Sequence, residues 1–168
     1  MARPLRIEVA GAWYPVMNRG HRGGALFLDE ADRRRFLGAV AELPERFALE
    51  VHAFVLMPDH YQVLVRTREA NLSHAIRWLN VSYAIKFNWA HRCHGTVFQG
   101  RFKGVLIQEE DKAVEVARYV HLNPVRIGGL GLSQSDQRRT RVLGCENCIT
   151  RGATGRSESP AARRSRKR

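Results

Sequence analysis

The chain has 168 residues, a length typical of one domain, and its 44% hydrophobic content excludes a wholly disordered protein. No apolar run reaches the roughly 18 residues that a membrane-spanning helix needs, so we expect no membrane association. The first residues lack the apolar core of a signal peptide, and three cysteines do not make an even disulfide set. Together these features predict a cytoplasmic protein, and the net charge of +12 favours nucleic acid as its partner.

The positive charge is distributed unevenly. Residues 138–168 contain ten basic and two acidic side chains and therefore carry +8, which leaves +4 for residues 1–137. The terminal segment is rich in Gly, Ser, Thr and Arg, so we expect a basic, disordered tail after a single domain at 1–137. Chemistry is expected from the first 137 residues, within a protein associated with the nucleoid.

Hydrophobic periodicity and turn signals predict seven elements. In chain order they are a strand at 12–18, a helix at 29–43 capped by Asp29, strands at 49–57 and 60–66, a helix at 71–90, a strand at 95–108, and a helix at 111–123 that ends before Pro124. The apolar run at 49–57 predicts a buried central strand. This order indicates an α+β fold of ferredoxin-like type, with helices packed on an antiparallel sheet.

His60 and Gln62 alternate along the third predicted strand and therefore share a face, while Tyr61 points away. An imidazole nitrogen and a carboxamide oxygen at this spacing can bind a divalent cation, and oxygen ligands suit Mg²⁺ or Mn²⁺. The alternative is a half-exposed strand whose polar side chains meet solvent.

Tyr119 and Asn123 lie four residues apart and therefore occupy one face of the last predicted helix. Tyr119 is a candidate nucleophile if a nearby cation favours its phenolate, and Asn123 would then reach the same cation. A core tyrosine with a solvated hydroxyl is the alternative, in which case Tyr83 becomes the next candidate.

The segment at 97–103 alternates basic and aromatic side chains beside glycines, a pattern suited to phosphate contact and base stacking. An amphipathic strand would give the same pattern. We assign DNA contacts to Arg19, Gln99, Arg101, Lys103 and Arg126.

Several short phrases occur in a fixed order between residues 14 and 129. They are Asn18-Arg19-Gly20, Leu56-Met57-Pro58-Asp59-His60, Asn71-Leu72-Ser73, Tyr83 with Phe87-Asn88, Phe98-Gln99-Gly100-Arg101-Phe102, and the run from Arg118 through Tyr119 to Arg126. In order and spacing this set resembles the REP-associated tyrosine transposases, a bacterial branch of the single-tyrosine HUH transposases.

The resemblance implies a metal-dependent strand transferase with an HUH endonuclease fold. Two histidines of a His–hydrophobic–His motif bind the cation in that family, at positions that match His60 and Gln62, with Asn123 as a third ligand. The matching nucleophile is Tyr119, which would form a 5′-phosphotyrosine link to single-stranded hairpin DNA within a homodimer. A carboxamide at Gln62 is a poorer ligand for transition metals than imidazole.

Two rival classes stay open. Cys145 and Cys148 form half of a zinc site, and His91, Cys93 and His94 are the residues that could in principle supply the rest. The other rival is a domesticated nucleic-acid-binding protein on the same fold that has weakened or lost strand transfer.

Overall fold

The computed structural model describes residues 7–126 and the side chains among them up to Leu122. Its elements are β1 (Trp13–Arg19), the 3-10 turn η1 (His21–Gly23), α1 (Glu30–Ala41), α2 (Leu43–Phe47), β2 (Leu49–Leu56), β3 (His60–Thr67), α3 (Leu72–His91), β4 (Lys103–Gly104) and α4 (Glu110–Arg126). None of the helices in this part of the chain is both long and apolar enough to cross a membrane.

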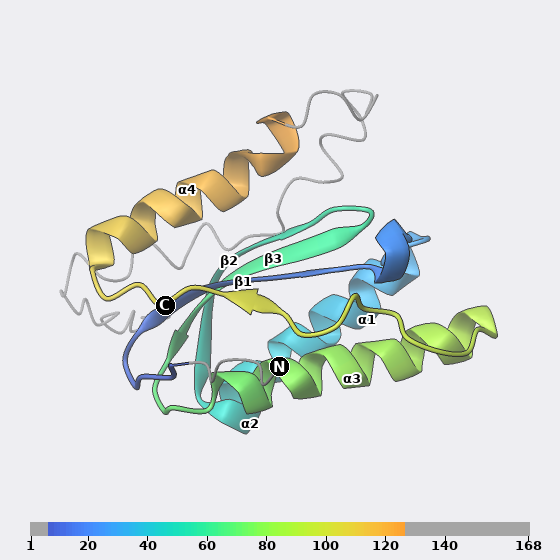
Figure 1. Cartoon of the computed structure of the whole chain (residues 1–168), viewed down its shortest axis with the longest axis horizontal. Coiled ribbons are helices and arrows are strands. Elements are labelled where there is room, and N and C mark those ends of the chain that lie inside the picture. The colour runs from blue at the N-terminus through green and yellow to red at the C-terminus, as the bar shows by residue number, and fades with distance from the viewer. Residues whose placement is uncertain (1–6, 127–168) are drawn as a thin grey trace, which may run out of the picture.

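The four strands form one antiparallel sheet in the order β2-β3-β1-β4. Three helices, α1, α2 and α3, lie on one side of this sheet, and α4 crosses the other side (Figure 1). The predicted α+β, ferredoxin-like arrangement is therefore confirmed. Asp29 also caps α1 as expected, since its side chain accepts a hydrogen bond from the Asp32 amide at 2.7 Å.

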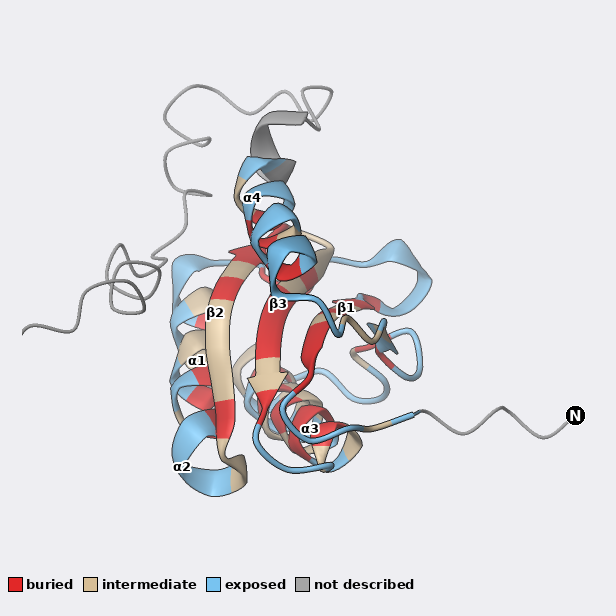
Figure 2. Cartoon of the chain, turned by 90° about the vertical axis from the view of Figure 1, so that its left-hand side faces the viewer, coloured by how far each residue is buried: buried red, intermediate tan, exposed pale blue. Residues whose placement is uncertain are grey.

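Each face of the sheet has its own apolar core, because successive side chains of a strand point to opposite faces. Tyr61, Val63 and Val65 of β3 pack with the α1–α3 layer. Leu64 of the same strand belongs to the other core, in which Trp13, Ala53, Val55 and Met57 meet Ala113, Ala117 and Val120 of α4. Buried residues therefore follow the strands between exposed outer helix faces (Figure 2).

The position predicted for the strand at 49–57 is wrong, because β2 lies at the edge of the sheet and not at its centre. Its apolar run has a different origin. Leu49 and Leu56 pack into the core beneath α1–α3, while Ala53 and Val55 pack beneath α4. A strand covered by helices on both faces is apolar throughout even where one of its edges has no neighbour.

Two further boundaries differ from the sequence prediction. The segment 95–108 contains only the short β4, with isolated bridges at Phe98 and Ile107, because Gly95 and Gly100 adopt positive φ values of 104° and 92° that interrupt an extended strand. The backbone of α4 continues through Pro124 to Arg126. A proline removes one backbone donor, and here the helix extends past it.

Asp32 links α1 to α3 below the sheet. Its carboxylate is fully buried and accepts hydrogen bonds from the Leu28 amide at 3.0 Å and from Arg35 at 2.8 Å. The ring of His91, at the end of α3, lies 2.8 Å from the same carboxylate. This buried charge therefore has partners from the loop before α1, from α1 itself and from α3.

We expect Asp32→Ala to lower the free energy of unfolding by about 3 kcal/mol, because the Leu28 amide, Arg35 and His91 all lose the buried carboxylate that they contact. Glu30→Ala is the matched control, since Glu30 is exposed and its ion pairs are 3.8 and 4.0 Å long. Glu30→Ala should lower the free energy of unfolding by less than about 1 kcal/mol. Urea denaturation of both variants measures the difference, and equal losses would contradict the structural role of Asp32.

Candidate active site

The alternation of β3 places His60 and Gln62 on the face covered by α4, while Tyr61 between them is buried on the α1–α3 side. The neighbouring strand fixes their positions, because His60 pairs with Arg19 and Gln62 with Met17 across the β1–β3 ladder. The side chain of His60 retains 15% of its exposure. Two potential metal ligands thus lie one pleat apart on a rigid central strand.

Asp59 orients the imidazole of His60. The Asp59 Oδ1 atom lies 2.7 Å from His60 Nδ1, and Arg19 Nη2 lies 2.8 Å from Asp59 Oδ2. Burial would raise the pKa of Asp59, but the hydrogen bonds from His60 and Arg19 and the positive charge of Arg19 outweigh it, so its pKa lies below the ordinary value. The ionised carboxylate only accepts, so Nδ1 carries the proton and Nε2 keeps its lone pair.

The loop geometry behind this arrangement depends on Gly20. Its amide donates to the Asp59 carbonyl at 2.8 Å, which joins the end of β1 to the β2–β3 turn. A Cβ at this position would collide with the Gly24 carbonyl. Only glycine therefore fits the tight turn at 20–24, from which the Gly20 amide reaches the Asp59 carbonyl.

Gln62 also has a preferred orientation. Its Nε2 lies 3.9 Å from Met17 Sδ, a weak contact in which the amide donates and the sulfur accepts. This leaves the carboxamide oxygen Oε1 as the group available to a cation.

Tyr119 and Gln62 line one cavity of about 340 Å³ between α4 and the sheet. Residues of every wall contribute to it: Pro15, Val16 and Met17 of β1, Gln62 and Val63 of β3, Lys103, Gly104 and Val105 around β4, and Val116, Tyr119 and Val120 of α4. The helix points Val120 into the core and leaves Tyr119 47% exposed. A tyrosine, a glutamine and a lysine are therefore among the residues that line this cavity.

The other three tyrosines of the chain are buried and have their hydroxyls engaged. Tyr14 accepts from the Val9 amide, Tyr61 donates to Asn80 at 2.7 Å, and Tyr83 donates to the Leu26 carbonyl. Burial raises the pKa of both Tyr61 and Tyr83 well above the ordinary value, which disfavours their phenolates. Tyr83 is therefore not a suitable alternative nucleophile, and Tyr119 is the exposed one.

The residues assigned to DNA contact separate into different places. Lys103 lies in the Tyr119 cavity, whereas Arg101 lines a different groove against α3. Arg19 is paired with Asp59, and the backbone amide of Gln99 donates to the Arg19 carbonyl at 2.8 Å. The side chains of Asn123 and Arg126 lie outside the described part of the structure. The role of Asp59 in orienting His60 was not foreseen, although its position directly before that histidine was the available signal.

Within residues 7–126, one group of three His, Cys, Asp or Glu side chains could hold a metal ion. It consists of Asp29, Asp32 and His91, whose ligand atoms lie within 4.8 Å of one another. Both carboxylate oxygens of Asp32 already accept from protein donors, and His91 faces the same group. This cluster is therefore explained by the junction of α1 and α3. Cys145 and Cys148 lie outside the described residues, and His91, one of the three residues that could complete a zinc site with them, is engaged with Asp32.

Comparison with known proteins identifies the family. The family model described as IS200-like transposase matches residues 9–123, which include β1 through Tyr119. No curated protein sequence matches the chain.

A solved structure shares the fold. A REP-associated tyrosine transposase bound to a REP hairpin aligns with a TM-score of 0.62 and 19% identity, covering 76% of this chain and 75% of that chain. A protein from Deinococcus radiodurans R1 described as a transposase aligns with a TM-score of 0.45 and 15% identity over 71% of this chain and 94% of its own. Because the family match spans well over half of the sequence, the chain belongs to the IS200-like transposases, a family that carries out DNA transposition in mobile elements.

Proposed function

We propose that this transposase cleaves and rejoins single-stranded DNA by the single-tyrosine HUH mechanism, with Tyr119 as the nucleophile. One observation carries the proposal. Tyr119 is the exposed tyrosine of the chain, and it lines a cavity together with Gln62, on the same face of β3 that carries His60. A phenol and two metal-ligand types on one surface are the groups that this chemistry needs.

In the proposed cleavage step, the Tyr119 oxygen gives its proton to solvent water and attacks the phosphorus of the scissile phosphate. The bond from phosphorus to the 3′ oxygen breaks and that oxygen takes a proton from solvent, which leaves a 5′-phosphotyrosine link and a free 3′-hydroxyl. Attack of a 3′-hydroxyl on this link reverses the step and joins strands. Lys103, in the same cavity, supplies positive charge toward the phosphate and the developing phenolate.

His60 and Gln62 fit a divalent cation in their donor chemistry. Asp59 leaves Nε2 of His60 as the lone-pair atom, and Met17 leaves Oε1 of Gln62 as the acceptor. Mixed nitrogen and oxygen ligands suit Mg²⁺ or Mn²⁺, with Asn123 as a further proposed ligand. Such an ion would polarise the scissile phosphate when bound.

The substrate proposed for this site is single-stranded DNA that carries a hairpin. Support comes from the structural neighbour of 19% identity, which was solved with a REP hairpin, and from the basic side chains Lys103 and Arg101 on either side of the sheet edge. We further propose that the chain acts as a homodimer. The alternative is a DNA-binding protein without strand transfer, and the presence of Gln62 in place of a second histidine is the observation that favours it.

Replacing the nucleophile tests the proposal directly. Tyr119→Phe should abolish the covalent adduct with a hairpin oligonucleotide that has randomised single-stranded flanks, and its stability should change little because the ring is half exposed. Tyr83→Phe is the control. It should lose roughly 1 kcal/mol of stability, with the hydrogen bond to Leu26, and should still form the adduct. Denaturing gels and mass spectrometry detect the adduct, and its persistence in Tyr119→Phe would refute the assignment.

The Gln62 position tests the metal assignment. Gln62→His should raise the affinity for Mn²⁺ severalfold while changing that for Mg²⁺ less, because imidazole is the better ligand for a transition metal. Gln62→Ala should weaken the binding of both ions. Calorimetric titration of each ion measures these affinities, and identical values in all three proteins would show that Gln62 does not bind the metal.

Asp59 is expected to act as a positioning residue for His60. Asp59→Ala should weaken Mn²⁺ binding by about 10- to 100-fold, the usual cost of losing a partner that orients a histidine ligand. Glu50→Ala is the matched control, since Glu50 is also an ion-paired carboxylate with 31% side-chain exposure but lies on β2. Equal Mn²⁺ affinities of the two variants would contradict this role.

A further inference from the structure

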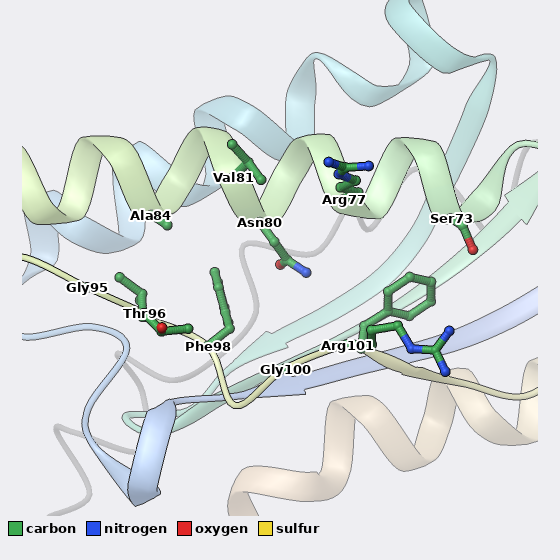
Figure 3. A pocket seen from close by; sticks show the side chains of 12 residues that line it. Ser73, Arg77, Asn80, Val81, Ala84, Gly95, Thr96, Phe98, Gly100 and Arg101 are labelled. Carbon is green, nitrogen blue, oxygen red and sulfur yellow. The ribbon is translucent and has the colours of Figure 1, made fainter. Parts of the chain in front are cut away.

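A second depression lies on the opposite side of the sheet from Tyr119. It is a groove of about 620 Å³ between α3 and the segment 95–102, which leads into β4 (Figure 3). Its lining residues come from those two segments: Ser73, Arg77, Asn80, Val81 and Ala84 of α3, and Gly95, Thr96, Val97, Phe98, Gly100, Arg101 and Phe102. The volume is within the range of small-ligand sites in proteins.

The wall opposite α3 is held in place by backbone hydrogen bonds. The His21 amide donates to the Val97 carbonyl at 2.9 Å, and the Gln99 amide donates to the Arg19 carbonyl at 2.8 Å. At the other end of the segment, Asn88 of α3 donates to the Gly95 carbonyl at 3.0 Å. Contacts within the protein therefore hold this wall of the groove in place, so that binding does not need to order it.

Asn80 presents a hydrogen-bond donor to the groove. Its Oδ1 accepts from the buried Tyr61 hydroxyl at 2.7 Å, which fixes the amide and leaves Nδ2 as the group directed into the groove (Figure 3). Around it the lining is mainly apolar, with Val81 and Ala84 on α3 facing Val97 and the accessible atoms of Phe98. An apolar slot with one fixed amide donor suits a flat heterocycle with a carbonyl edge.

Two arginines line the groove on opposite walls: Arg77 lies on α3 between Asn80 and Ser73, and Arg101 lies on the facing segment (Figure 3). In the described part of the chain no acidic residue lines the groove, and the Glu8 carboxylate beside it accepts from the Ser73 amide at 2.9 Å. Neither arginine forms an ion pair with another residue in the range 7–126. Unneutralised guanidinium groups beside an apolar slot favour an anionic ligand, and their planar donors match phosphate oxygens.

We propose that this groove binds one unpaired nucleotide of the DNA, with its base in the apolar slot beside Asn80 and its two flanking phosphates at Arg77 on the α3 wall and at Arg101 on the opposite wall. This inference rests on the proposed function, since the nucleotide belongs to the same single-stranded substrate. Only Phe102 separates Arg101, in the groove, from Lys103, in the Tyr119 cavity. A DNA strand that passes around the β4 edge of the sheet would therefore contact both the groove and the Tyr119 cavity.

Binding of a labelled hairpin oligonucleotide with randomised single-stranded flanks, measured by fluorescence anisotropy in EDTA to prevent cleavage, tests this proposal. Val81→Trp fills the groove at a position that is 50% exposed, and it should weaken binding at least about fivefold through loss of the base contact. Ile85→Trp places the same ring one turn further along α3, at a site that is 65% exposed and outside the groove, and should bind like wild type.

The role of the two arginines in the groove is tested by the salt dependence of DNA binding. Arg77→Ala and Arg101→Ala should each reduce the slope of log affinity against log salt by about 0.7, the value for one phosphate contact to single-stranded DNA. Arg34→Ala, an equal change of charge on α1 where the side chain is 79% exposed, should leave the slope unchanged.

The outcomes separate this proposal from the proposed function. Unchanged DNA affinity in Val81→Trp, in a protein that still forms the Tyr119 adduct, would overturn the groove assignment and leave the transposase chemistry intact. If Val81→Trp changed only self-association in sedimentation, the occupant would be a second copy of the chain, and the proposal would be wrong. If the groove variants lost DNA affinity but the wild-type protein formed no Tyr119 adduct, the nucleotide-binding role of the groove would be supported and the cleavage mechanism would be refuted.

Discussion

The arrangement of this protein depends on one constraint, the alternation of β3 between two apolar cores. Tyr61, Val63 and Val65 must pack against the α1–α3 layer, so His60, Gln62 and Leu64 are directed toward α4. A shift of one residue in the register would move the polar pair into the larger core. The burial of three large side chains thus fixes where the polar pair lies, and the candidate site occupies the face that packing leaves for it.

The surrounding structure refines this placement. Gly20 brings the loop after β1 against the β2–β3 turn, where Asp59 joins Arg19 and His60 through short hydrogen bonds. On the other side of the cavity, α4 binds the sheet through Ala113, Ala117 and Val120, which leaves Tyr119 half exposed over β1 and β3. Most of the rigidity of the site comes from backbone pairing and small apolar contacts, and few polar groups are required.

Much of the fold could be predicted from local pattern, because periodicity and capping report directly on helices and paired strands. The cap at Asp29, the alternation at His60 and Gln62, and the apolar face of α4 are examples. The position of β2 at the edge of the sheet could not be predicted. Apolar residues on both faces of a strand indicate that helices cover both faces, but they do not indicate how many strands lie beside it. The segment 95–108 was expected to be a strand, but glycines with positive φ prevent regular pairing there.

The sequence by itself determined the order of elements, the family phrases and the set of chemical groups available. It could not determine which tyrosine is exposed, because Tyr14, Tyr61, Tyr83 and Tyr119 are chemically alike and differ only in what packs around them. The sequence also did not indicate that Arg101 and Lys103, two residues apart, line different cavities. This separation arises because the chain turns across the edge of the sheet between them. Burial and juxtaposition depend on contacts between distant segments, and only the tertiary structure determines them.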